Sequence, residues 1–171
     1  MAISVDMFCK TYKANSKAKD KTFEDFIKKH ITTKYISFIQ KNVYCTSIVY
    51  NSCHKKDGDR EFIEIDSVMR YMHFIMRLID LYTDIEITPD TLVEDYDKLN
   101  EIGAIETLIA AIPESEYAEF STILNMKLDD FRENEYSLTA LLYNLKESFS
   151  LSEEIITSAL ETITKENNSN E

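Results

Sequence analysis

Apolar residues recur at intervals of three and four along most of this chain, which is the spacing of a helix that buries one face. The segment at 33–52 shows this best, with apolar positions at Tyr35, Ile36, Phe38, Ile39, Val43, Ile48 and Val49. The same spacing predicts further helices over 4–13, from Thr22, over 68–82, from Asp90, over 104–112, after Pro113, from Ser137 and from Ser152. We therefore expect eight or nine helices, with a break near Gly103.

One short run departs from the helical spacing. The residues FIEI at 62–65 alternate between apolar and polar, as in a strand, after a turn-like segment at 54–61. This run has no evident pairing partner in the chain, so we expect an extended connector here rather than a sheet. Asp66 or Ser67 then provides an N-cap for the helix at 68–82.

The helix at 68–82 is the most hydrophobic element of the chain, and its polar residues form one narrow stripe. The stripe consists of Arg70, His73, Arg77 and Asp80, at spacings of three, four and three. An apolar helix with one polar stripe is typical of a central helix surrounded by others.

This stripe has three interpretations: pairing along the helix (Asp66 with Arg70, Arg77 with Asp80), a groove for an acidic partner helix, or catalysis. No nucleophile or second acid accompanies His73 in the sequence pattern. We therefore regard the four residues as a possible partner-binding stripe and predict no catalytic residues.

The composition favours helices over sheets. The 171 residues suit one domain, and they include only two glycines and two prolines, whereas sheets joined by tight turns need more of both. The prediction is an all-α, single-domain orthogonal bundle of eight or nine helices with a flexible basic N-terminal arm. The arm is an N-terminal helix and basic linker at 1–21, the helical domain covers 22–166, and 167–171 form a disordered tail.

Charge is divided unevenly along the chain. Residues 1–60 contain twelve Lys and Arg against six Asp and Glu, whereas residues 61–171 contain seven against twenty-five, and the net charge is −12. Such a division would let copies associate head to tail, or let one copy fold back on itself. Nine lysines lie within 10–41 and could contact phosphates. The net negative charge of the chain repels a nucleic-acid duplex, however, and arginine, the usual base-reading residue, does not occur before Arg60. We therefore do not expect nucleic-acid binding.

The sequence indicates neither a cofactor site nor a metal site. Cys45, Cys53 and His54 lack the ligand spacing of structural zinc, and all three cysteines, including Cys9, are interpreted as reduced thiols of a cytoplasmic protein. Phosphate-binding loops, nucleophile elbows and HExxH motifs are missing from the sequence. The N-terminus does not resemble a signal peptide, and apolar runs of membrane-spanning length are missing. We therefore expect a binding protein rather than an enzyme.

Three segments carry a resemblance to a known family. They are FIKKHITTKYISFIQK at 26–41, RYMHFIMRLIDLYTDIEI at 70–87 and AIPESEYAEFSTILNMKLDDFRENEYSLTALL at 111–142. Together they resemble small acidic helical proteins of long-tailed bacteriophages of low-GC Gram-positive hosts, and above all the tail assembly chaperones, over 23–165. The resemblance implies a protein of the host cytoplasm that binds the extended tape-measure protein, or tail tube subunits, while these subunits polymerise. It also implies that a longer form arises by ribosomal frameshifting in many members, and it carries over no catalytic or binding residues.

Two further functions fit the same sequence. The acidic part of the chain could act as a helical decoy that mimics DNA and inhibits a host defence protein. The gene would then lie outside the group of genes that encode the structural proteins of the virion. The chain could instead be a connector or tail-completion protein that stays in the mature virion. A tail assembly chaperone would be missing from purified virions, and its gene would precede a very long helical reading frame.

Overall fold

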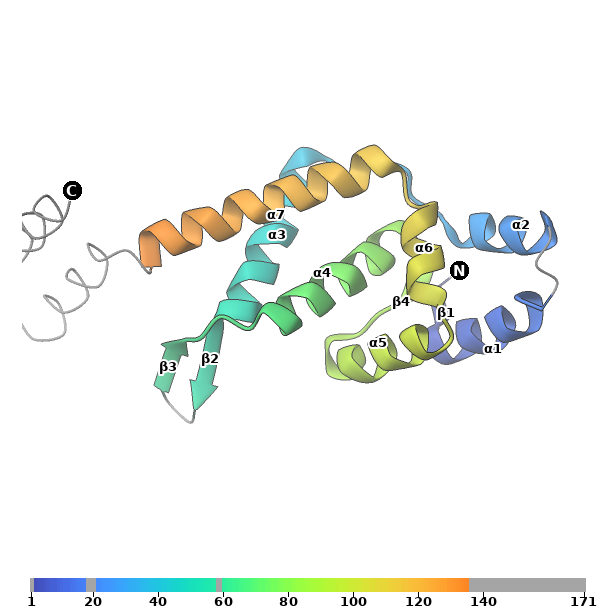
Figure 1. Cartoon of the computed structure of the whole chain (residues 1–171), viewed down its shortest axis with the longest axis horizontal. Helices are drawn as coiled ribbons and strands as arrows, with labels where there is room; N and C mark the ends of the chain where they lie inside the picture. Colours follow the sequence, from blue (N-terminus) through green and yellow to red (C-terminus); the bar gives the residue numbers. More distant parts are fainter. Residues whose placement is uncertain (1, 18–20, 58–59, 136–171) are drawn as a thin grey trace, which may run out of the picture. The chain divides into compact units, whose positions relative to one another are not determined.

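The computed structural model describes residues 2–17, 21–57 and 60–135 (Figure 1). The chain divides into two compact units, Met1–Lys127 and Leu128–Glu171. The helices of the described part belong to the first unit, apart from the C-terminal part of α7 (Glu114–Glu135), which crosses the division.

Helices dominate the described residues. Seven α-helices lie in this part of the chain, with the short 3-10 helix η1 (Pro89–Thr91): α1 (Val5–Asn15), α2 (Lys21–His30), α3 (Phe38–Cys53), α4 (Ser67–Tyr82), α5 (Leu92–Glu101), α6 (Ala104–Ala111) and α7. The all-α prediction is confirmed for this part, although the count here is seven rather than eight or nine. The helices predicted from Ser137 and Ser152, and the tail at 167–171, lie outside the described residues.

Local capping signals set the ends of several helices. Ser37 and Gln40 form a capping box, in which the Gln40 backbone N–H donates to the Ser37 hydroxyl at 3.4 Å. This cap makes α3 begin at Phe38, later than predicted. α4 begins after Asp66, as predicted, because the Asp66 carboxylate accepts hydrogen bonds from two backbone N–H groups of the first turn, at 3.1 and 2.9 Å. Gly103 adopts a left-handed conformation (φ 68°) between α5 and α6, which confirms the predicted break.

α4 is the central helix of the first unit, as its single polar stripe predicted. It contacts α3, α5 and α6, and Figure 1 shows it running through the middle of the unit. Its inward side chains are completely or almost completely buried, and they include Met76, Leu78, Ile79 and Tyr82. Burial of this apolar surface is the main force that holds the neighbouring helices on α4.

The expectation of a single extended connector at 62–65 was wrong. β2 (His54–Asp57) and β3 (Arg60–Ile63) pair as antiparallel strands, with His54 opposite Ile63 and Asp57 opposite Arg60. β2 follows the last residue of α3 directly, and its sequence, HKKD, has no alternation of apolar and polar residues. A periodicity search therefore could not recognise it as the partner of β3.

The N-terminal helix is part of the packed body, so the prediction of a flexible arm was wrong for α1. Val5, Phe8 and Tyr12 of α1 are buried, and the Phe8 ring stacks on Phe26 with a centroid distance of 5.9 Å. The two residues before α1 form β1 (Ile3–Ser4), which pairs in parallel with β4 (Ile85–Glu86). Residues 18–20 of the predicted basic linker lie outside the described residues.

Candidate protein-binding surface

The structure separates the predicted stripe of α4 into the Arg77–Asp80 pair and Arg70, which makes a different contact. Arg77 and Asp80 form the predicted pair, with Nη1 and Oδ2 at 2.8 Å, and the Arg77 guanidinium lies 5.2 Å from the centre of the Tyr44 ring. The predicted Asp66–Arg70 pair was wrong. The Asp66 carboxylate caps α4, and Arg70 donates from Nη2 to the Ser67 hydroxyl at 3.3 Å.

A small hollow lies beside the C-terminal part of the stripe. It has a volume of about 110 Å³, and it is lined by α3, α4 and the segment that leads into α5, including Ser47, Asn51, His73, Arg77, Asp80 and Pro89. Arg70 is not among the lining residues. The hollow therefore gathers three of the four stripe residues, and it adds two polar side chains of α3 that the sequence analysis did not single out.

Ser47, His73 and Asp80 are the residue types of a hydrolase triad, but they are not connected as one. The Asp80 carboxylate accepts from Arg77, and the Ser47 hydroxyl accepts from the Asn51 amide at 3.5 Å. Burial and the charge of Arg77 lower the pKa of His73, so its imidazole is neutral at pH 7. In the part of the chain that the structure describes, no hydrogen bond joins His73 to either side chain, and a serine nucleophile needs that bond for activation.

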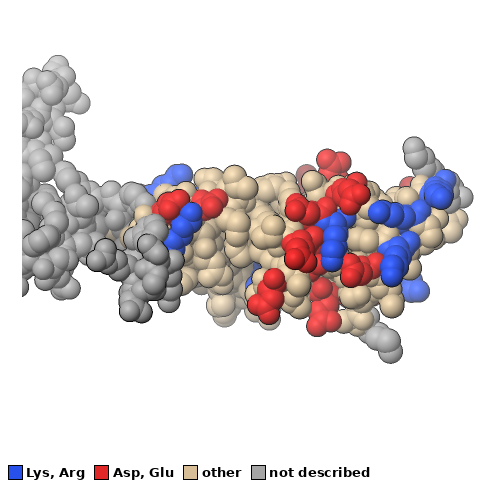
Figure 2. All heavy atoms as spheres, turned by 90° about the horizontal axis from the view of Figure 1, so that it is seen from below, with Lys and Arg blue, Asp and Glu red and all other residues tan. Residues whose placement is uncertain are grey.

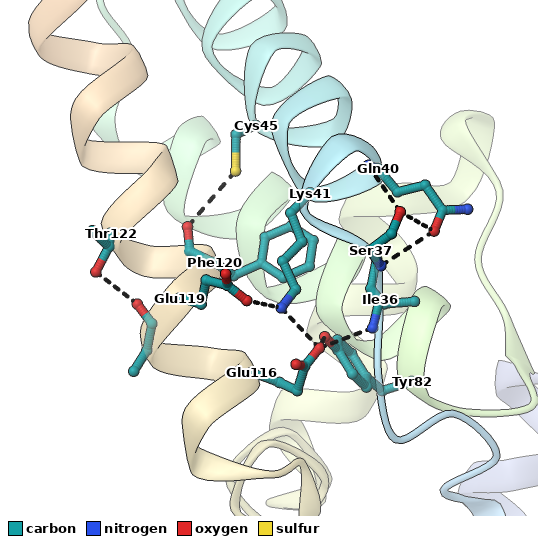
Figure 3. A network of polar contacts seen from close by, with 11 residues as sticks. Ile36, Ser37, Gln40, Lys41, Cys45, Tyr82, Glu116, Glu119, Phe120 and Thr122 are labelled. Carbon is teal, nitrogen blue, oxygen red and sulfur yellow. Dashed lines mark hydrogen bonds and ion pairs between the residues drawn. The ribbon is translucent and has the colours of Figure 1, made fainter.

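A buried ionic network holds α3 in place (Figure 3). The Lys41 ammonium is completely buried and contacts two carboxylates of α7, that of Glu116 at 2.9 Å and that of Glu119. Oε2 of Glu116 also accepts hydrogen bonds from the Tyr82 hydroxyl and from the backbone N–H of Ile36, the latter at 3.0 Å. One carboxylate oxygen thus ties together the start of α3, the end of α4 and the start of α7.

The pKa shifts in this network show that the hydrogen bonds outweigh burial. Burial alone would raise the pKa of Glu116, but the bonds from Tyr82, Ile36 and Lys41 leave it lowered. Burial alone would lower the pKa of Lys41, but its bonds to Glu119 and Glu116 leave it raised. Lys41 and Glu116 are therefore both charged at neutral pH, and each satisfies the other.

Because Lys41 points inward, the opposite side of α3 faces outward. Ile39 is 75% exposed and Val43 is 57% exposed, and Thr46 and the half-exposed Tyr50 follow on the same side. The spacing of these four residues is four, three and four, which is the spacing of a helix–helix seam. We call Ile39, Val43, Thr46 and Tyr50 the α3 stripe. Two further exposed aromatic residues, Tyr35 and Phe38, lie at the amino end of α3, and the Tyr35 ring lies toward the Lys41 side of the helix, with its centre 5.4 Å from the Lys41 ammonium.

The surface of α3 carries almost no charge, because the helix contains almost no charged residues. The helix contains no Asp or Glu, and its only Lys or Arg is the buried Lys41. Figure 2 shows where charged side chains gather on the face seen from below: carboxylates and basic groups crowd the right of the view, and a second, smaller group of both lies toward the left. Exposed apolar residues on a helix without surface charge make α3 a candidate interaction surface on this protein of net charge −12.

The apolar positions of 33–52 were expected to form one buried face, and this expectation was wrong for four of them. Ile48 and Val49 are buried against the body, whereas Tyr35, Phe38, Ile39 and Val43 are exposed. The signal that could have revealed the stripe is that apolar residues occur around the whole circumference of the helix.

The cysteines and acidic groups of the described residues form no metal site. No cluster of three or more His, Cys, Asp or Glu with the geometry to hold an ion occurs within these residues. Cys9, Cys45 and Cys53 are free thiols, and burial raises the pKa of Cys45 to about 11 against a smaller opposing effect of Lys127. Buried thiols with raised pKa values are poor nucleophiles and poor ligands.

Comparisons with known proteins give no relative for this chain. No protein-family model, no curated protein and no solved structure matches it. Among the helices of the described residues, none combines the length and the apolar character that a bilayer crossing requires.

Proposed function

We propose that this protein is a non-enzymatic binding protein that holds an apolar helix of another protein along the α3 stripe. The observation that carries the proposal is the exposure of Ile39 and Val43 at a helix-seam spacing on a helix without surface charge. An amphipathic partner helix binds such a surface by placing its own residues at i, i+3, i+4 and i+7 against it.

The internal chemistry favours binding over catalysis. Several buried ionisable groups of the described residues are engaged with each other, as in the Lys41–Glu116 pair and in the His30–Asp84 contact of 2.7 Å. Groups engaged in this way hold helices together, and they do not supply a poised acid or base to a substrate.

Within this class, we propose a tail assembly chaperone of a long-tailed phage, with the tape-measure protein as the partner. The resemblance of 26–41, 70–87 and 111–142 to that family suggests this partner, and the physical requirements agree with it. A long apolar tape-measure helix has to stay soluble until tail tube subunits surround it. A helical protein with an apolar stripe covers such a helix, and a charge of −12 keeps the complex dispersed. This role places the protein in the cytoplasm of the infected host.

Co-expression with the tape-measure protein of the same genome tests the proposal. The wild-type chain should keep that protein in the soluble fraction and co-purify with it, and Val43→Glu should abolish both effects because it places a charge in the apolar contact. Val93→Glu is the matched control, since Val93 is an equally small residue on a helix and is 52% exposed. Equal behaviour of the two variants, or an insoluble tape-measure protein beside the wild-type chain, would contradict the proposal.

The acidic surface of α5 supports a second candidate, an inhibitor that mimics DNA. Glu94, Asp97 and Glu101 are exposed on this helix, and Lys98 among them forms an ion pair with Asp6 at 2.9 Å. A decoy would bind a basic nuclease in a salt-sensitive manner, and it would lose binding on neutralisation of the α5 carboxylates but not on Val43→Glu. Mass spectrometry of purified virions separates both candidates from a connector or tail-completion protein, which would remain in the particle.

A further inference from the structure

We propose that the hollow beside the C-terminal part of α4 binds a carboxylate carried on a short aliphatic chain. The inference goes beyond the proposed function and does not depend on it, because the lining of the hollow does not include the residues of the α3 stripe. A free short-chain acid and a glutamate side chain of another protein present the same chemical group. Both are therefore sources of this ligand, and binding experiments separate them.

The polar groups that line the hollow are mainly hydrogen-bond donors. Arg77 uses Nη1 for Asp80, and the other two nitrogens of its guanidinium have no hydrogen-bond partner in the described residues. The Ser47 hydroxyl accepts a hydrogen bond from the Asn51 amide at 3.5 Å, so its own proton is free to donate. The half-buried His73 ring likewise has no hydrogen-bond partner within the part of the chain that the structure describes. Water hydrates such groups in the free protein, and a ligand with acceptor oxygens replaces that water.

The charge near the hollow favours an anion, although the protein as a whole is acidic. Apart from the Arg77–Asp80 pair, the residues that line the hollow are uncharged at pH 7. Burial and the charge of Arg77 lower the pKa of His73, and no carboxylate of the described residues opposes this effect. Arg70, three residues before His73, has no carboxylate partner among the described residues, and its Nη1 is buried without an acceptor. The local potential is therefore positive, which attracts a carboxylate to this side of α4.

The rest of the lining is apolar, and it selects the body of the ligand. This part consists of Ile48, Met76, Ile87, Pro89 and Leu92. The volume of the hollow, about 110 Å³, suits a small ligand only. Inorganic phosphate would lose hydration against these hydrocarbon walls without gaining a partner there, so it fits less well than an aliphatic carboxylate.

A carboxylate in the hollow would accept hydrogen bonds from Arg77, Ser47 and His73. The negative charge beside the imidazole raises the pKa of His73 on binding, so the ligand binds more tightly as the pH falls toward that pKa. The ligand also competes with Asp80 for the Arg77 guanidinium. Because a free acid of this size has few atoms and Arg77 is already engaged on one side, we expect a dissociation constant in the millimolar range.

NMR titration of the full chain with propionate, at neutral pH and constant ionic strength, tests the inference. The ring resonance of His73, identified by its loss in His73→Gln, should shift with a millimolar dissociation constant, and the pKa of His73 should be higher at saturating propionate. Propionamide has the same shape without the charge, and phosphate has the charge without the aliphatic chain. Each should bind at least about tenfold more weakly than propionate.

Two substitutions in the ion pair should change the affinity in opposite directions. Arg77→Gln should weaken propionate binding by more than about tenfold, because it removes the cation. Asp80→Asn should strengthen binding by about threefold or more, because the amide no longer competes for Arg77. Asp25→Asn makes the same change in net charge at an exposed position of α2, and its dissociation constant should stay within about twofold of wild type. A general loss of packing would weaken binding in both variants of the pair, so opposite signs exclude it.

An alanine-rich helical peptide with a single glutamate separates the two sources of the ligand. Binding at least as tight as that of propionate assigns the hollow to a glutamate side chain of a partner, whereas weaker binding assigns it to a free acid. The inference is overturned if His73 does not respond to about 0.1 M propionate, or if propionamide or phosphate binds as tightly as propionate. It is also overturned if Asp80→Asn weakens binding while circular dichroism shows that this variant is folded.

Discussion

The buried ammonium of Lys41 lies 2.9 Å from the carboxylate of Glu116, and this pair joins the first turn of α3 to the first turn of α7. Lys41 precedes Val43 by two positions and therefore points to the opposite side of α3. The ion pair and the buried apolar residues Ile48 and Val49 lie on the same side of α3, so that the apolar residues of the opposite side remain at the surface.

Replacement of Lys41 by methionine should lower the free energy of unfolding by about 3–5 kcal/mol, because it leaves the buried Glu116 carboxylate without its cation. Glu119→Gln is the control. The Glu119 side chain is 44% exposed, so water replaces the lost contact and the change should stay below about 1 kcal/mol. Urea unfolding followed by circular dichroism measures both values. A Lys41→Met variant as stable as wild type would show that the pair does not fix α3.

Acid should destabilise the first unit partly through Glu116. Its folded-state pKa is lowered, so the unfolded chain takes up the proton first, at its ordinary pKa of about 4.3. The stabilising contribution of Glu116 is complete above that pH and is lost as the pH falls through the folded-state pKa. Unfolding measured from neutral to acid pH should therefore show a smaller acid loss in Glu116→Gln than in wild type, with exposed Glu114→Gln as control.

Alkali should act on the same network through Lys41, with the opposite sign. Its folded-state pKa is raised above the ordinary value of about 10.4, so its contribution is complete below that pH and is lost as the pH rises through the folded-state pKa. Unfolding measurements continued to alkaline pH show this loss of stability. The loss should be smaller in Lys41→Met than in wild type. If the free energy of unfolding depended on pH in the same way in the variants and in the wild type, at both acid and alkaline pH, the proposed titration of this pair would be contradicted.

The packing of α1 predicts that its side chains contribute strongly to stability. Phe8 is completely buried between the rings of Phe26 and His30, so Phe8→Ala should lower the free energy of unfolding by about 3–5 kcal/mol. Its neighbour Met7 is 58% exposed, and Met7→Ala should change the value by less than about 0.5 kcal/mol. A flexible arm would instead give two equally small effects in thermal or urea unfolding.

The thiols should differ in their reactivity toward an alkylating reagent at mildly alkaline pH. Cys45 and Cys53 are completely buried, whereas Cys9 is half-buried near the surface of α1. In the folded protein Cys9 should react first, and slowly, because burial raises its pKa. All three should react once the protein is unfolded, as mass spectrometry of the alkylated peptides would show. Rapid labelling of Cys45 in the folded protein would contradict its burial against the carbonyl of Phe120.

Part of the site was predictable because it depends on neighbours along one helix. The Arg77–Asp80 pair follows from their spacing, and the N-cap at Asp66 follows from residue type. The Asp66–Arg70 pair failed for the same local reason, since the carboxylate of Asp66 was already engaged by the first turn of α4. The pairing of β2 with β3 was not predictable, because HKKD shows no strand periodicity.

The amino-acid sequence by itself determined that the described part of this chain is helical, where α4, α5 and α6 begin or break, and that acidic and basic residues are segregated. These properties depend on spacing, capping and composition, which act over a few residues. The tertiary structure alone decided that α1 belongs to the body and that Ile39 and Val43 face outward. Both outcomes depend on contacts between distant segments, Phe8 with Phe26 and Lys41 with Glu116, and periodicity identifies apolar residues without showing which of them another helix covers.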